Sequence, residues 1–359
     1  MKRIVEAAAI KTETNQTEIN MQAEMARLAH AHAGIARIDP MHRCVPLPHS
    51  ALLPVMGSSV RLETNSSKLL RHMVELFAQY DGEPNGSPSF HWRIVVDPDV
   101  TFSPLWPRRS TFSDDGLRFA QFGHRNFIAV DLEAREAVAF VAEGLLGDAP
   151  GFTSPFIDTL FYMTSGSLGL VPITAACVSS GTKGLLVMGA PNQGKTTASY
   201  LATQGGLTFH ADQSVFLEMA SGELRAWGDF VPIAFRPETI QFLPELASRT
   251  RTFSYCDFTF FYMDKQRRDS ALPGFVAPIC CVVLERDSAA VPRLVRLAES
   301  ELSSSLSKYV AFKDDDQFEE PWSKILATLA LVPAYQLTYG SDPATAAPFL
   351  AHLLTRHDV

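Results

Sequence analysis

Residues 189–196 read GAPNQGKT, which matches the pattern G-x-x-x-x-G-K-T known as Walker A. Its glycines let backbone N–H groups turn toward phosphate oxygens, its lysine adds a positive charge, and its hydroxyl can bind Mg²⁺. An apolar stretch at 184–188 precedes the motif and predicts a buried strand. The segment 196–203 follows it and predicts a helix that ends at the glycines of 205–206. This order of strand, loop and helix predicts an α/β unit with an anion at the helix N-terminus.

The motif predicts a nucleoside triphosphate, taken as ATP, and Mg²⁺ as the ligands. Lys195 is expected to stabilise the charge on the terminal phosphates, and the Thr196 hydroxyl to bind the metal. The loop binds phosphates rather than the base, so it leaves ATP and GTP open. A glycine-rich turn that binds nothing is the alternative. The residues expected to contact the nucleotide are Gly189, Ala190, Pro191, Asn192, Gln193, Gly194, Lys195, Thr196 and Thr197.

Composition excludes several classes of protein. Of 359 residues, 46% are hydrophobic and 19% charged, which allows a sizeable core. The net charge of −8 argues against nucleic acid or an anionic membrane as a partner. No stretch approaches the roughly 20 apolar residues of a membrane span, and residues 1–9 do not form a secretory signal, so a cytoplasmic location is expected. The cysteines lack C-x-x-C spacing and are expected to be reduced core thiols: Cys44, Cys177, Cys256, Cys280 and Cys281.

The pattern along the chain predicts an α/β fold with two domains. We expect an ancillary, partly disordered segment at 1–45, a smaller α+β domain at 46–165, and a P-loop domain with a mixed sheet at 166–359. In the smaller domain the expected strands and helices are an edge strand at 59–64, a helix through 69–77, a strand at 90–96, an antiparallel meander of 117–122, 127–132 and 137–141, and a helix at 154–162. In the P-loop domain they are strands at 173–178, 185–188, 207–210 and 279–285, a hairpin of 214–219 and 224–227, and helices near 322–330 and 344–354.

A carboxylate is needed beside the phosphates, either to bind Mg²⁺ or to act as a base. Asp212 follows the strand at 207–210, and ligands of open α/β sheets bind at the carboxyl ends of strands. We therefore expect Asp212 to serve both as base and as metal ligand; its alternative role is to start a turn. His210 alternates with Asp212 and is expected on the same face, as a substrate contact or as a hydrogen-bonded structural residue.

The P-loop, the helix after it and the strand ending in Ala211-Asp212 resemble HPr kinase/phosphorylase and its relatives. Those relatives include HPr-kinase-like enzymes associated with ribosomally made peptides such as lasso peptides. The resemblance covers residues 170–354 and includes the closing stretch 332–340. It implies an HPr kinase/PEP carboxykinase-like fold, ATP and Mg²⁺ as cofactors, and Asp212 as the base that activates a serine-type hydroxyl. The smaller domain resembles the extra domain of these proteins in general layout.

Two positions depart from the family pattern. Gln213 stands where the family has a second carboxylate, and an amide is a poorer Mg²⁺ ligand. Thr174 stands where the family commonly has a histidine. A third carboxylate could compensate, and the sequence offers Glu218, Asp229 and Glu238 without ranking them.

Two groups of basic residues are further candidates for substrate contact. Arg236 is the cation of the expected substrate-side loop 227–242 and could clamp a phosphate or an acidic acceptor; a plain surface arginine is the alternative. Lys265, Arg267 and Arg268 could form a lid over ATP or a solvated surface.

The leading hypothesis is an ATP- and Mg²⁺-dependent kinase that phosphorylates a Ser/Thr-type hydroxyl of a peptide or small protein. A nucleotide-sensing interaction module with little phosphotransfer is the alternative favoured by Gln213 and Thr174. A small-molecule kinase or a plain ATPase is a third hypothesis. The acceptor and the oligomeric state stay open.

Overall fold

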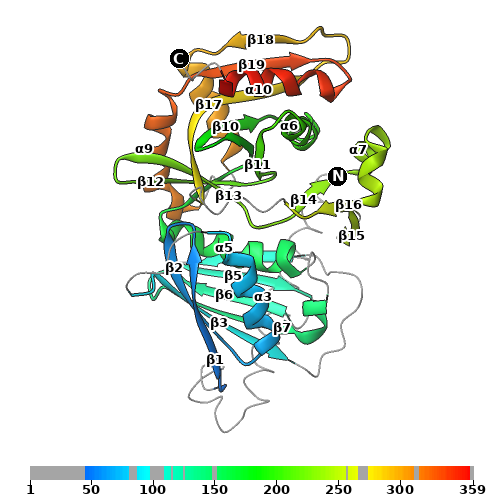
Figure 1. The fold of residues 1–359 in the computed structure, drawn as a ribbon. Coiled ribbons are helices and arrows are strands. Elements are labelled where there is room, and N and C mark those ends of the chain that lie inside the picture. Colours follow the sequence, from blue (N-terminus) through cyan, green and yellow to red (C-terminus); the bar gives the residue numbers. More distant parts are fainter. Residues whose placement is uncertain are drawn as a thin grey trace, which may run out of the picture.

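The computed structural model describes residues 45–80, 87–97, 109–114, 116–123, 126–147, 152–255, 258–265, 274–310 and 315–355. Outside these ranges lie the expected ancillary segment up to residue 44, with Cys44, and also Cys256, Arg267 and Arg268. The fold is mixed α/β and contains three sheets, two of which combine parallel and antiparallel pairs (Figure 1).

The first sheet has seven strands, in the order β1-β2-β3-β7-β6-β5-β4. The predicted meander is confirmed as β5, β6 and β7, which pair antiparallel in sequence order. The prediction of an edge strand at 59–64 is wrong, because β1 pairs with the outer side of β2 while β3 pairs parallel with its inner side. The strands are β1 (His49–Val55), β2 (Ser58–Thr64), β3 (Phe90–Asp97), β4 (Arg109–Asp114), β5 (Leu117–Phe122), β6 (Asn126–Asp131) and β7 (Glu136–Ala142).

Helices α3 (Ser67–Phe77) and α5 (Asp158–Ser165) pack against this sheet. Ser66 caps α3, since its Oγ accepts a hydrogen bond from the Leu69 amide at 3.2 Å. The predicted helix at 154–162 is present but irregular. It begins as a π-helical turn at Phe152–Ile157, where Pro155 cannot donate a backbone hydrogen bond, and becomes α-helical only at α5. Short 3-10 turns flank this region at Glu143–Gly147 and Gly166–Leu168.

The second sheet has nine strands: seven follow the path β11-β9-β10-β17-β13-β12-β8, β19 pairs with β17, and β18 pairs with β19. The predicted hairpin of 214–219 and 224–227 is confirmed as β12 and β13. The strands are β8 (Val171–Ile173), β9 (Ala176–Ser180), β10 (Lys183–Met188), β11 (Thr208–Ala211), β12 (Val215–Ala220), β13 (Glu223–Gly228), β17 (Phe275–Arg286), β18 (Arg293–Arg296) and β19 (Ala334–Tyr339).

The prediction of one strand at 173–178 is wrong. The segment divides into β8, which pairs with β12, and β9, which lies between β10 and β11. Thr174 lies between the two strands, and its amide donates to the Tyr309 carbonyl at 2.6 Å. The backbone therefore leaves one part of the sheet and enters another at this residue, which an apolar run cannot reveal.

Helices cover both faces of the nine-stranded sheet. Cys280 and Cys281 lie next to each other on β17 and pack into different clusters, as their alternation predicts. Both thiols and that of Cys177 are buried and unbridged, as expected of core cysteines. The helices are α6 (Lys195–Gln204) and α10 (Ala347–Thr355) in the cluster of Cys280, and α8 (Glu299–Tyr309) and α9 (Glu319–Leu329) in that of Cys281.

The third sheet has the order β14-β16-β15 and lies beside α6 and the short helix α7. Strand β14 directly precedes α7, and Arg236 stands between them as the N-cap residue of the helix. The elements are β14 (Ile233–Phe235), α7 (Pro237–Phe242), β15 (Arg251–Tyr255) and β16 (Phe258–Met263).

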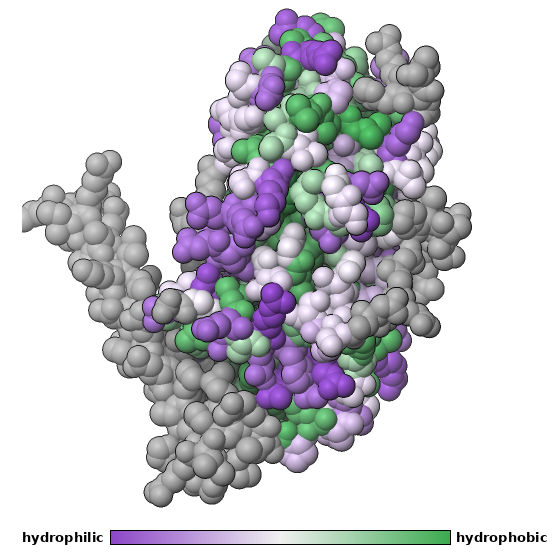
Figure 2. Space-filling model, turned by 90° about the vertical axis from the view of Figure 1, so that its left-hand side faces the viewer, coloured by the Kyte–Doolittle hydropathy of each residue, from purple (hydrophilic) through white to green (hydrophobic). Residues whose placement is uncertain are grey.

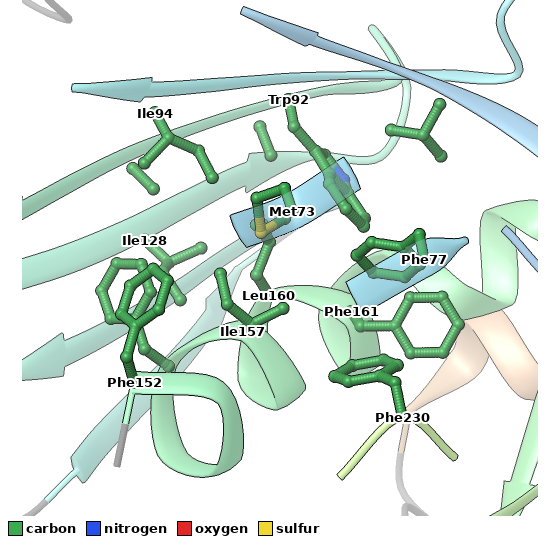
Figure 3. Close-up of a cluster of buried hydrophobic side chains, with 14 of the residues drawn as sticks. Met73, Phe77, Trp92, Ile94, Ile128, Phe152, Ile157, Leu160, Phe161 and Phe230 are labelled. Carbon is green, nitrogen blue, oxygen red and sulfur yellow. The ribbon is translucent and has the colours of Figure 1, made fainter. Parts of the chain in front are cut away.

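One hydrophobic cluster contains residues of both larger sheets. Phe230, from the segment after β13, lies 5.1 Å from Phe77 of α3 and 5.4 Å from Phe161 of α5, measured between ring centroids. Trp92 of β3 packs on the other side of Phe77 at 5.8 Å (Figure 3). Since α5 lies at the junction of the two halves in Figure 1, the halves meet through packed aromatic rings.

The described surface is mixed in character. On the face drawn in Figure 2, hydrophilic and hydrophobic residues alternate in small patches. None of the helices in the described ranges is long and apolar enough to cross a membrane.

Candidate nucleotide-binding site

The P-loop joins the end of β10 to the start of α6. Gly189, Asn192 and Gly194 adopt φ angles of 150°, 67° and 76°, so the backbone reverses direction repeatedly between Met188 and Lys195. Gly194 is the N-cap residue of α6, and no side chain caps the helix. The first amides of α6 therefore remain available to an anion, with the helix dipole favouring negative charge.

Two residues far along the chain hold this loop. The Tyr339 hydroxyl, at the end of β19, donates to the Gln193 carbonyl at 2.7 Å. The Gln193 side chain accepts a hydrogen bond from the Arg286 amide at the end of β17. A Cβ added to Gly194 would lie 2.2 Å from the Tyr339 hydroxyl, which shows how closely the ring approaches the loop. Tyr339 was part of the closing stretch 332–340, but no local spacing links it to the P-loop, so this contact was not predicted.

Lys195 points back onto its own loop. Its Nζ donates to the carbonyls of Gly189 at 2.8 Å and Ala190 at 3.2 Å. Burial lowers the pKa of Lys195 from its ordinary value, Asp212 raises it, and Arg236 lowers it. The charges of Asp212 and Arg236 therefore both act on the Lys195 ammonium.

Asp212 comes directly after β11 and is 2% exposed. Its Oδ2 accepts a hydrogen bond from the Ala234 amide of β14 at 3.1 Å. Its Oδ1 is buried and makes no hydrogen bond of ordinary geometry, although the nearby Thr196 hydroxyl still acts to lower the pKa. Burial outweighs these hydrogen bonds and raises the pKa of Asp212 to about 6.

The structure distinguishes the three candidates for a compensating carboxylate. Glu218 accepts a hydrogen bond from the Trp227 indole at 2.9 Å and packs beside Gly57 of the other half of the chain. Glu238 is exposed in the first turn of α7. Asp229 is 1% exposed, and its charge raises the pKa of Asp212. Asp229 is therefore the candidate that shares the site with Asp212.

The remaining predicted site residues lie at different places in the fold: inside the sheet, at the surface, between helices and beside Asp229. The His210 Nε2 lies 2.6 Å from the Ser179 Oγ of β9, a hydrogen bond inside the sheet that matches the structural role. Arg236 and Gln213 are exposed. The Thr197 hydroxyl lies 3.3 Å from that of Thr239 in α7, a contact between helices that the sequence did not indicate. Lys265 forms an ion pair with Asp229 and is thus part of the site rather than of a solvated surface.

Comparison with known proteins leaves the family of this chain open. No protein-family model matches the sequence, and no curated protein matches it. The chain is similar to the solved structure of the Hpr(Ser) kinase/phosphatase from Coxiella burnetii. The similarity has a TM-score of 0.26 and 10% identity, and it covers 52% of this chain and 94% of that protein. We therefore infer function from the side chains of the site.

The oxygen atoms of the site suit a magnesium ion that also binds phosphate. Among the described residues, no three His, Cys, Asp or Glu side chains converge as they would in a metal site made by protein alone. Mg²⁺ bound with a nucleotide needs only one or two carboxylates, a hydroxyl and phosphate oxygens. The buried Oδ1 of Asp212, which makes no hydrogen bond of ordinary geometry, and the Thr196 hydroxyl fit this chemistry.

Proposed function

We propose that this protein is a P-loop phosphotransferase that uses ATP and Mg²⁺ to phosphorylate a Ser/Thr-type hydroxyl of a peptide or small protein. The observation that carries the proposal is the buried carboxylate of Asp212, with one oxygen lacking an ordinary hydrogen bond and a pKa of about 6, in the electrostatic neighbourhood of Lys195. A base works best when its pKa lies near the operating pH.

Each residue has a distinct task in this proposal. The amides of the P-loop and of the first turn of α6 bind the phosphates. Lys195, whose Nζ donates to the carbonyls of Gly189 and Ala190, lies within the loop and would also donate to phosphate oxygens bound there. Thr196 and Asp212 would hold Mg²⁺, which would neutralise phosphate charge. The Asp212 carboxylate would take the proton of the attacking hydroxyl through the oxygen that does not bind Mg²⁺.

A second candidate function has its own support. The site has an exposed amide at Gln213, and the neighbouring carboxylate of Asp229 is already paired with Lys265. Both features would limit Mg²⁺-dependent chemistry. A nucleotide-sensing module, in which ATP binds without phosphotransfer, is therefore the alternative that the experiment must separate.

The test is Asp212→Asn, which keeps the size of the side chain and removes its basicity. With [γ-³²P]ATP and a degenerate library of serine- and threonine-containing peptides, we expect transfer to fall by about 10²-fold or more. ATP affinity, measured by calorimetry, should change by less than about threefold. Asp131→Asn is the matched control, because Asp131 lies at the end of β6 in the first sheet and its side chain accepts a hydrogen bond from the turn amide of Ala134.

Transfer by the wild-type protein should also rise with pH through about 6, as Asp212 loses its proton. Equal transfer by Asp212→Asn and wild type would remove Asp212 as the base. Saturable ATP binding with no transfer to any peptide would favour the sensing module instead.

A further inference from the structure

Asp229 stands in the same relation to β13 as Asp212 does to β11. Each aspartate directly follows its strand, and each is almost fully buried. The two strand ends touch, because a Cβ added to Gly228 would lie 2.3 Å from the carbonyl oxygen of His210. Glycine at 228 thus allows the two backbones to approach, and the aspartates that follow are near enough for the charge of Asp229 to act on Asp212.

The place where they meet has an excess of negative charge. Asp229 raises the pKa of Asp212 and also that of Asp158, the first residue of α5. Lys265 and Arg109 act in the opposite direction on Asp158. Asp158, Asp212 and Asp229 thus place three carboxylates near one another, and two of them are almost completely buried. Such a group is stable only beside positive charge.

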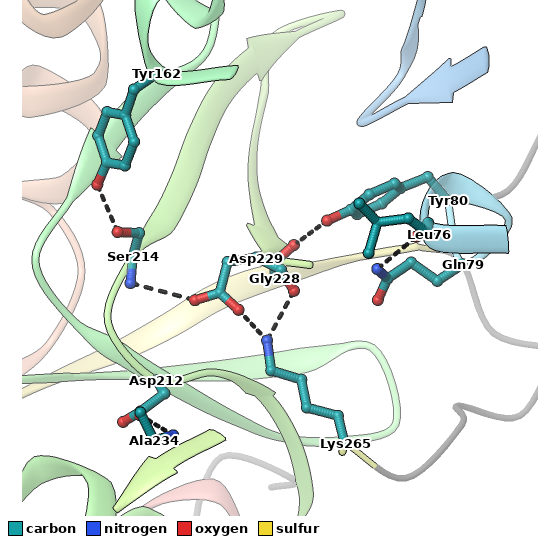
Figure 4. A network of polar contacts seen from close by, with 10 residues as sticks. All are labelled: Leu76, Gln79, Tyr80, Tyr162, Asp212, Ser214, Gly228, Asp229, Ala234 and Lys265. Carbon is teal, nitrogen blue, oxygen red and sulfur yellow. Dashed lines mark hydrogen bonds and ion pairs between the residues drawn. The ribbon is translucent and has the colours of Figure 1, made fainter. Parts of the chain in front are cut away.

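Lys265 supplies part of that charge. Its Nζ contacts the Asp229 carboxylate and also donates to the Asp229 backbone carbonyl at 2.7 Å. Figure 4 shows the ammonium group held between these two oxygens of one residue. Oxygen atoms from carboxylates and carbonyls are also the ligands that hard divalent cations prefer.

Asp229 is held by groups other than Lys265. Its Oδ2 accepts a hydrogen bond from the Ser214 amide at 3.4 Å, and the Ser214 hydroxyl bonds the hydroxyl of Tyr162 in α5. The neighbouring Gly228 carbonyl accepts a hydrogen bond from Tyr80 at 2.7 Å. Both tyrosines belong to the other half of the chain, so the carboxylate keeps its position if the lysine moves away.

We propose that Asp229 is the second carboxylate of the cation site, in place of Gln213, and that the Lys265 ammonium occupies its oxygens until Mg²⁺ arrives with the nucleotide. This rests on the nucleotide-dependent function proposed above. The exchange needs no covalent change: the divalent cation takes the carboxylate oxygen, and the lysine, whose four-carbon stem is flexible, withdraws from it.

The test measures Mn²⁺, which replaces Mg²⁺ and is visible by electron paramagnetic resonance. Affinity is measured with saturating ADP at pH 8 on the full chain. Lys265→Met should tighten Mn²⁺ binding by about tenfold or more, since one charge-assisted hydrogen bond no longer competes. Asp229→Asn should weaken it by a similar factor, and adding Lys265→Met to Asp229→Asn should change nothing further. Lys324→Met is the matched control, because Lys324 pairs with Glu320 on the exposed side of α9.

Two outcomes overturn this inference but leave the proposed function intact, provided that the wild-type protein binds Mn²⁺ and ADP. In the first, Lys265→Met leaves the Mn²⁺ affinity unchanged or makes it weaker. In the second, Asp229→Asn binds Mn²⁺ as well as wild type does. Wild-type protein that binds neither ligand overturns the proposed function and this inference with it. If Lys265→Met does not fold, amine labelling of the wild type decides. Lys265 should label faster with Mn²⁺ and ADP than with ADP alone, and equal labelling refutes the exchange.

Discussion

Asp158 offers a direct test of the charge distribution beside the site. Burial, and next the charge of Asp229, raise the pKa of its carboxyl from 3.8 to about 7. A carboxyl whose pKa is raised by folding stabilises the folded state while it is protonated there, and this contribution is lost as the pH rises through about 7. Asp158→Asn removes that pH-dependent contribution. The variant should therefore gain stability relative to wild type as the pH increases.

The magnitude follows from the size of the pKa change. The full difference between 3.8 and about 7 corresponds to about 4 kcal/mol, of which about 2.7 kcal/mol falls between pH 5 and pH 7. Asp158 is only partly buried by surface area, and water reduces the effect. We therefore expect the unfolding free energy of Asp158→Asn, relative to wild type, to be about 1–1.5 kcal/mol higher at pH 8 than at pH 5.

The assay is urea unfolding at pH 5 and pH 8, followed by tryptophan fluorescence. Trp92 and Trp227 are buried on the two sides of the shared core, so the signal reports on both halves. Comparing the difference between variant and wild type at two pH values cancels any constant effect of the asparagine. An Asp229→Asn background should reduce the pH-dependent difference, because Asp229 is one of its causes. The reasoning is refuted if the unfolding free energy of Asp158→Asn minus that of wild type is the same at both pH values, or higher at pH 5 than at pH 8.

Two further substitutions test how the site is held. Gly228→Ala should lower the unfolding free energy by about 1–3 kcal/mol in urea titrations, because the new Cβ would meet the His210 backbone at 2.3 Å. Gly147→Ala, which adds a Cβ to open space, is its control and should change stability by less than about 0.5 kcal/mol. Tyr339→Phe should cost about 1 kcal/mol of stability and weaken ATP binding several-fold by calorimetry, since it removes the hydrogen bond to the Gln193 carbonyl. Unchanged ATP affinity in a folded Tyr339→Phe protein would show that this bond does not shape the loop.

Short-range sequence patterns predicted those strands and helices that depend on residues close together in the chain. The strand before the P-loop, the helix after it and the hairpin of β12 and β13 follow from glycine positions and apolar spacing within about 20 residues. The prediction that Asp212 lies near Lys195 is likewise consistent with the electrostatic influence of one on the other. Each of these predictions concerns residues that lie at or next to the end of a strand or helix.

Contacts that depend on distant pairing were not predictable in this way. Nothing in the run 173–178 shows that β8 and β9 pair with different partners, because both strands are apolar and buried up to Val178. The contact of Lys265 with Asp229 spans 36 residues, and it depends on where β13, β14 and β16 end in space. Sequence analysis therefore named both residues as candidates but did not predict the contact between them.

The aromatic contact between the halves has a consequence for how the protein can change. Phe77, Phe161 and Phe230 pack against one another across the boundary between the halves. Each half therefore has an apolar surface there that the other half covers. Separating the chain near residue 165 would leave these rings in water on both fragments. The two halves are therefore expected to fold and unfold as one unit, and a substitution that loosens these rings from the first sheet would also weaken the packing beneath the segment after β13.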